Sequence, residues 1–144
     1  MSGNFDKMQI DRFETLGDVS SKVEYFQKRG GIFYTTQLNT FIFIGETTSE
    51  IEAETIKKFS SECFDYSVKN NPGRSVGNRS VVISIAVLIG DNVKDSAKKV
   101  CLYNAALHWS SFEVNAIFDR RSNTLSTLKF FPLWGLHHYF FIFK

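Results

Sequence analysis

Hydrophobic and polar positions follow two different periods along the chain. Apolar residues recur at intervals of three and four in three segments, which predicts helices over residues 18–29, 49–70 and 94–109. The second helix has the clearest start, because Ser49 and Glu52 form a capping box that satisfies two backbone donors. Its buried stripe is predicted to contain Ile56, Phe59, Cys63 and Tyr66.

Aromatic and β-branched residues predict strands in the segments between these helices. Residues 32–37 and 41–45 are expected to form a hairpin through the short link at 38–40. The run over 80–89 is the most continuous β-branched apolar stretch of the chain. It therefore predicts a central strand that is buried on both faces.

The pattern in the last third of the chain predicts antiparallel strands. Residues 112–118 alternate between apolar and polar side chains, which predicts a half-solvated strand, and two more strands are expected over 124–130 and 138–143. The predicted fold class is α+β, with the order α-β-β-α-β-α-β-β-β and a mostly antiparallel sheet. We expect one domain over residues 1–144, with a loose lead-in over residues 1–14.

Composition narrows the class of protein. The chain has 144 residues, of which 43% are hydrophobic and 22% charged, and this excludes disorder as the main state. No run approaches the roughly 20 apolar residues of a membrane-spanning helix. The N-terminus shows no basic segment followed by an apolar one, so we expect a cytoplasmic protein without a membrane partner. Cys63 and Cys101 are predicted to be buried thiols, because two distant cysteines make no disulfide framework.

A polar loop over residues 71–79 is the first candidate site. Residues 73–144 contain 9 basic and 4 acidic residues, against 8 and 11 in residues 1–72, so the basic charge lies in the C-terminal half. Glycines in the loop permit close backbone approach, and arginines offer planar forks for phosphate or carboxylate. The predicted anion-binding residues are Gly73, Arg74, Gly77 and Arg79.

Three histidines are the candidates for acid–base chemistry: His108, His137 and His138. His137 and His138 are neighbours on a predicted strand, so their rings point to opposite faces and cannot share one metal ion. His108 could meet Glu113 or Asp119 in space, but none of these spacings is typical of metal ligands. The sequence therefore predicts no metal site and no cofactor.

The C-terminal segment holds a dense group of aromatic residues. Both faces of its last strand are apolar, and an exposed edge strand of that kind would aggregate. We therefore expect the segment to be buried between two copies of the chain in a homodimer. The predicted interface residues are Phe130, Phe131, Trp134, Tyr139, Phe141 and Phe143.

Three hypotheses about function follow from these features. The first is a small non-catalytic module that binds a partner protein or a small ligand and self-associates through its aromatic C-terminal strands. The second is an enzyme that acts on a phosphate- or carboxylate-bearing substrate held by the 71–79 loop. The third is nucleic-acid binding by the basic C-terminal half, which would weaken steeply with salt.

Overall fold

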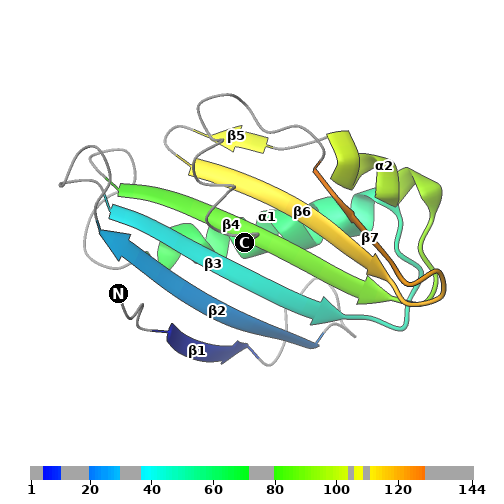
Figure 1. Cartoon of the computed structure of the whole chain (residues 1–144), viewed down its shortest axis with the longest axis horizontal. Coiled ribbons are helices and arrows are strands. Elements are labelled where there is room, and N and C mark those ends of the chain that lie inside the picture. Colours follow the sequence, from blue (N-terminus) through cyan, green and yellow to red (C-terminus); the bar gives the residue numbers. More distant parts are fainter. Residues whose placement is uncertain are drawn as a thin grey trace.

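The computed structural model describes residues 5–10, 20–29, 37–71, 80–103, 106–108 and 111–128. These residues form seven strands and two helices (Figure 1). The elements are β1 (Phe5–Ile10), β2 (Ser20–Arg29), β3 (Gln37–Glu46), α1 (Ala53–Lys69), β4 (Ser80–Gly90), α2 (Asp95–Tyr103), β5 (Ala106–His108), β6 (Ser111–Asp119) and β7 (Thr124–Thr127).

The strands form one mixed sheet whose centre is parallel. Its order is β1-β2-β3-β4-β6-β5, and β7 pairs with β6 outside this path. β4 runs parallel to both β3 and β6, because α1 and α2 each return the chain to the same end of the sheet. The predicted order of elements and the mostly antiparallel sheet are therefore wrong.

Residues 20–29 form strand β2, although the sequence predicted a helix over 18–29. β2 pairs with β1 on one edge and with the full length of β3 on the other. Val23 and Phe26 satisfy the three-residue spacing of a helix, but the same segment also fits a strand. Two neighbouring strands therefore override a weak local helix propensity.

The predicted hairpin through residues 38–40 is also absent. Residues 37–46 form the single continuous strand β3, whose antiparallel partner is β2. Within the predicted lead-in, Phe5–Ile10 forms β1. Residues 32–36 and the predicted strand over 138–143 lie outside the described residues.

Helix α1 and strand β4 agree with the sequence most closely. The stripe of Ile56, Phe59 and Cys63 is fully buried, as predicted. Residues 80–90 form β4, which lies between β3 and β6 and is buried on both faces. The helix begins later than predicted, because Glu52 and Thr55 form the capping box that was assigned to Ser49 and Glu52.

Helix α2 ends at Tyr103 rather than at residue 109, and residues 106–108 form β5. β5 pairs antiparallel with the start of β6 through His108 and Ser111. β6 itself is not half-solvated as predicted. Glu113 and Asn115 are buried, because one face of β6 lies beneath α1 and the other face belongs to a second apolar cluster.

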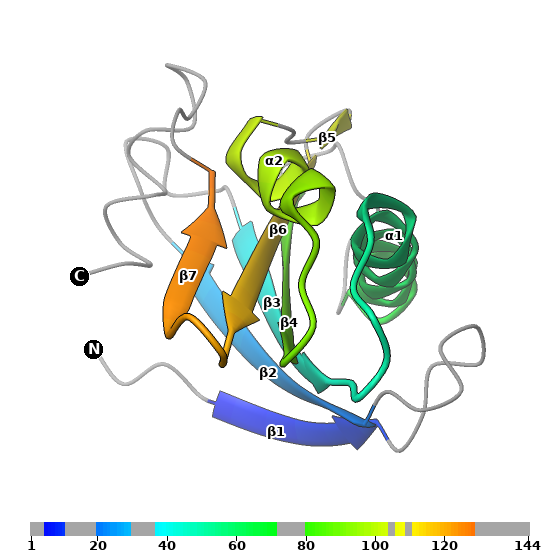
Figure 2. The same ribbon diagram turned by 90° about the vertical axis from the view of Figure 1, so that its right-hand side faces the viewer.

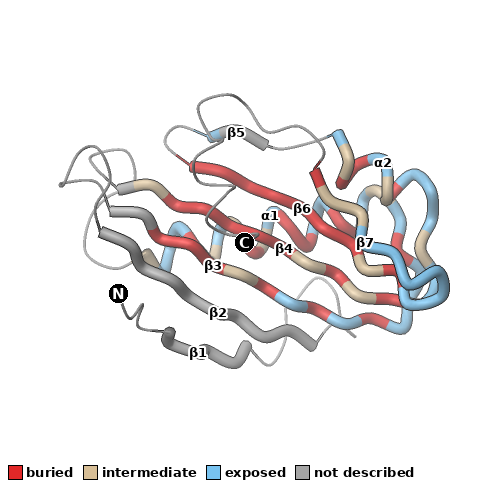
Figure 3. The backbone as a smooth tube through the Cα atoms, in the orientation of Figure 1, coloured by how far each residue is buried: buried red, intermediate tan, exposed pale blue. Residues whose placement is uncertain are grey.

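The main core lies between the sheet and the two helices, which cover the same face of the sheet (Figure 2). It contains Phe41 and Phe43 of β3, the buried apolar residues of α1 and α2, and those residues of β4 and β6 that face the helices, which are Val82, Ala86, Leu88 and Ile117. Burial is densest along β4 and β6, while exposed residues gather beyond the carboxyl-terminal ends of β3, β4 and β6 and on the outer faces of the helices (Figure 3). No helix among the described residues is long and apolar enough to span a membrane.

Candidate functional site

A layer of polar side chains lies between α1 and the sheet, near the amino-terminal ends of β4 and β6. We call these strand ends, together with β5, the amino edge. Five buried residues form this polar layer: Ser60, Ser84, Ser111, Glu113 and Asn115. Strand geometry places Ser111, Glu113 and Asn115 on one face of β6, and the register sets Ser84 beside Glu113.

Ser60 links α1 to two residues of β6. Its Oγ donates a hydrogen bond of 2.6 Å to Oε1 of Glu113 and lies within hydrogen-bonding distance of Oδ1 of Asn115. A serine hydroxyl carries one proton, so it donates to only one of these two acceptors at a time. Ser60 is completely buried, so its hydroxyl forms hydrogen bonds with protein groups and does not contact solvent.

His108 occupies the outer end of the same network. Its Nε2 lies 3.0 Å from Oε2 of Glu113, and its ring stacks on Phe64 with a centroid distance of 4.0 Å and an interplanar angle of 16°. The His108 side chain is 41% exposed, whereas that of Glu113 is 12% exposed. The ring is therefore fixed on one side and open on the other, and no described residue forms a hydrogen bond with Nδ1.

The pairing of β5 with β6 explains why this contact forms. His108 is the register partner of Ser111, so its ring lies on the same face of the sheet as Glu113, two residues further along β6. The sequence analysis named Glu113 and Asp119 as the acidic residues that His108 could meet. In the structure, the contact is with Glu113. Asp119 lies at the opposite end of β6, where it pairs with Lys98.

The hydroxyls of Ser84 and Ser111 form no hydrogen bond with any described residue, although both side chains are buried. A buried hydroxyl without a partner destabilises the fold by roughly 1–3 kcal/mol. Apolar side chains at these two positions would pack α1 on the sheet without this cost, so the two hydroxyls add polarity to the amino edge that packing alone does not explain.

The two cysteines offer no reactive thiolate. Burial raises the pKa of the Cys63 thiol well above its ordinary value, and the carboxylates of Glu62 and Glu113 raise it further. Burial alone raises the pKa of Cys101 to about 12. Both cysteines are free and buried, as the sequence predicted, so each fills the core as a neutral thiol.

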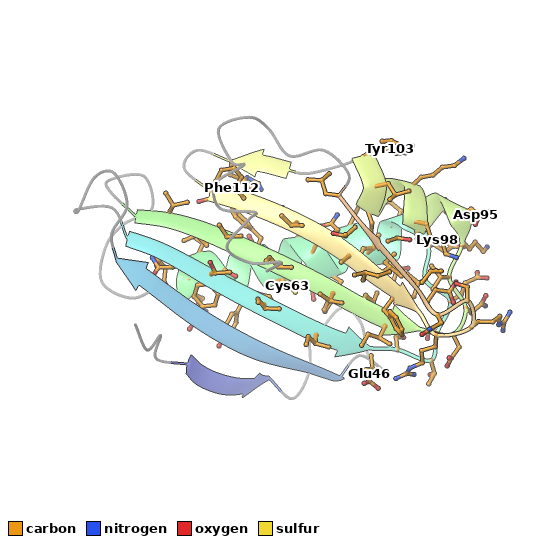
Figure 4. All side chains as sticks on the ribbon, viewed as in Figure 1. Glu46, Cys63, Asp95, Lys98, Tyr103 and Phe112 are labelled. Atoms are coloured by element: carbon orange, nitrogen blue, oxygen red, sulfur yellow. The ribbon has the colours of Figure 1, made fainter. Side chains whose placement is uncertain are left out.

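The carboxyl-terminal ends of the parallel strands carry a different group of charges. Figure 4 shows side chains crowded at this edge, among them Glu46 and Lys98. Arg120 donates a hydrogen bond of 2.7 Å to Glu46 and approaches Asp91 at 3.8 Å. Lys94 lies 2.9 Å from both Glu50 and Glu52, which lowers the pKa of Glu52 and raises that of Lys94.

Asp119 is the most strongly held carboxylate at this edge. Lys98 donates to it at 2.6 Å, and the backbone N–H of Arg121 donates at 3.0 Å. The hydrogen bonds from Lys98 and Ser122 lower the pKa of Asp119 to about 2. A lowered pKa means that the stabilisation is present above pH ~4 and is lost as the pH falls toward 2. The charged side chains at this edge form ion pairs with one another. We therefore assign them to stabilising the fold and not to binding a ligand.

Most of the site residues predicted from the sequence lie outside the described residues, and His108 is the exception. Those outside are Gly73, Arg74, Gly77, Arg79, Phe130, Phe131, Trp134, His137, His138, Tyr139, Phe141 and Phe143. Within the described part of the chain, no group of three or more His, Cys, Asp or Glu side chains could hold a metal ion.

Sequence reasoning missed Ser60, Phe64 and Asn115. Ser60 lies four residues after Ile56 and three before Cys63, so its place on the buried helical stripe was a readable signal. The partners of Phe64 and Asn115 depend on tertiary packing.

Comparison of the chain with protein-family models, with curated proteins and with solved structures finds no match.

Proposed function

We propose that the protein binds a small phosphate- or carboxylate-bearing ligand at the amino edge, where His108 contacts the anionic group. The observation that supports this most directly is the orientation of the ring. Glu113 fixes Nε2 and Phe64 supports one face, while the side chain stays 41% exposed. When protonated, such a ring donates one hydrogen bond inward and has Nδ1–H for a ligand.

The start of β4 gives a second argument. Ser80, the first residue of β4, directly follows the predicted anion-binding residues in the sequence. In the sheet, Val82 of β4 pairs with Ser111 of β6, which in turn pairs with His108. Ser80 therefore begins β4 at the amino edge, two strands from His108.

This binding step is common to the first two hypotheses drawn from the sequence. A non-catalytic module would bind the anion and release it unchanged. An enzyme would use His108 as a general acid or base on the bound molecule. The binding step is therefore the part to test first.

Titration of the protein with inorganic phosphate and acetate, followed by NMR signals of the His108 ring, tests the proposal. We expect saturable shifts that weaken about two- to fivefold in Arg74→Ala and Arg79→Ala, the range of exposed ion pairs, with an unchanged melting temperature. Lys58→Gln removes an exposed cation from α1 and serves as the control for net charge. The absence of a saturable shift with either anion would overturn the proposal.

We also propose that the protein is cytoplasmic and forms a homodimer through its aromatic C-terminal strands. The support for the dimer is the sequence of residues 138–143, because a strand formed by these residues would be apolar on both faces. Sedimentation equilibrium should give twice the monomer mass of 16.5 kDa, and Phe141→Glu should shift the equilibrium toward monomer. A monomeric wild-type protein would contradict the dimer, and recovery from a membrane or secreted fraction would contradict the location.

A further inference from the structure

We infer that Ser60 is a positioning residue, which holds the Glu113 carboxylate so that Glu113 in turn orients His108 toward the ligand. This inference rests on the proposed function. Ser60 and His108 bind the two different oxygens of one carboxylate: Oγ of Ser60 lies 2.6 Å from Oε1, and Nε2 of His108 lies 3.0 Å from Oε2. A carboxylate that is fixed at one oxygen presents the other in a defined direction.

The burial of these groups sets their order from inside to outside. Ser60 is completely buried, Glu113 is nearly so, and His108 is half exposed. A ligand can therefore reach only His108 among the three. Ser60 can influence binding only through Glu113, which makes it a positioning residue rather than a ligand contact.

Asn115 limits how firmly Ser60 holds Glu113. Oδ1 of Asn115 competes with Oε1 of Glu113 for the single proton of the Ser60 hydroxyl. Removing the amide should leave that proton to Glu113 alone. A change at Ser60 should therefore weaken the orientation of His108, whereas a change at Asn115 should not weaken it.

Two variants test this, and the chain offers a matched control. Ser60→Ala removes the donor to Glu113, while Asn115→Leu removes the competing acceptor. Ser67→Ala is the control, because Ser67 is also a fully buried serine of α1, but its hydroxyl donates to the carbonyl of Cys63 at 2.7 Å. Melting temperatures establish that each variant is folded.

The first measurement is the tautomer of the neutral His108 ring, read from the nitrogen chemical shifts of its ring, and it reports whether Nε2 stays directed at Glu113. We expect the wild type and Ser67→Ala to hold the proton on Nε2, facing Glu113, and Ser60→Ala to populate both tautomers. Asn115→Leu should keep or increase the Nε2–H form. Ser60→Thr retains a hydroxyl at this position and should restore the wild-type tautomer.

The second measurement is the affinity for inorganic phosphate, which should fall about three- to tenfold in Ser60→Ala and stay unchanged in Ser67→Ala. If the tautomer changes in Ser60→Ala while the wild type binds no phosphate, the positioning role holds and the proposed function fails. If the wild type binds phosphate and Ser60→Ala matches Ser67→Ala in tautomer, the positioning role is wrong. If Ser60→Ala does not fold, a loss of the Nε2–H form in Asn115→Leu would overturn the inference.

Discussion

Replacement of His108 by glutamine should lower the affinity for inorganic phosphate about 10- to 100-fold, the largest effect that we expect on binding. A hydrogen bond from a charged donor contributes roughly 1.5–3 kcal/mol, and glutamine cannot supply the charge. The substitution should leave the fold intact, because the His108 side chain is 41% exposed. Calorimetric titration of both proteins with inorganic phosphate measures the loss.

Acetate provides a second readout of the same variant, because it carries a carboxylate in place of a phosphate. The glutamine variant should bind acetate more weakly than the wild-type protein, since glutamine cannot donate from a charged ring.

Two comparisons decide whether the effect belongs to His108. Lys58→Gln removes one exposed positive charge from α1 and should leave the affinity unchanged. His137→Gln and His138→Gln test the other two histidines that the sequence offered. A loss in either of these variants, together with none in His108→Gln, would contradict the assignment.

The position of this site differs from the usual one in sheets with a parallel centre. Ligands generally bind beyond the carboxyl ends of parallel strands. Here that edge is occupied by ion pairs, among them those of Arg120 with Glu46 and of Lys98 with Asp119. The amino edge instead carries the buried network of Ser60 and Glu113, which ends in the exposed ring of His108. For this reason we propose a ligand site at the amino edge, although ligands bind there less commonly.

The parts of the fold that could be predicted from the sequence are those in which local pattern and tertiary environment agree. In α1 the apolar stripe indicates the helix that forms, although its capping box is Glu52 with Thr55 rather than Ser49 with Glu52, and β4 is apolar on both faces. The prediction for residues 20–29 is wrong because Val23 and Phe26 have the three-residue spacing of a helix, while Val23 and Tyr25 have the two-residue spacing of a strand. Only the pairing of β2 with β1 and β3 decides between them.

The candidate site was predictable only in part. The sequence indicates His108 from its chemistry and allows it to meet Glu113 or Asp119, but it predicts a helix over residues 94–109 where the structure has strand β5. The contact with Glu113 requires β5, a strand of three residues that leaves little periodic signal. The bond from Ser60 joins positions 53 residues apart, and no local pattern encodes a contact at that separation.

Among stability effects, we expect the largest from Phe43→Ala. Phe43 is completely buried on β3, with its ring 6.5 Å from that of Phe41 and in edge contact with Tyr66 of α1 at 5.7 Å. Truncation of a buried phenylalanine leaves a cavity that the neighbours fill only partly. The free energy of unfolding should fall by about 3–5 kcal/mol.

Urea unfolding measures this loss as a lower midpoint with an unchanged slope. Because the total stability of a domain is about 5–15 kcal/mol, this loss should remove at least about a fifth of it. Tyr103→Ala is the control, since Tyr103 is 65% exposed and its loss should cost less than about 0.5 kcal/mol. An equal, small effect in both variants would show that Phe43 does not join α1 to the sheet, and the packing of α1 over the polar layer would then lose its support.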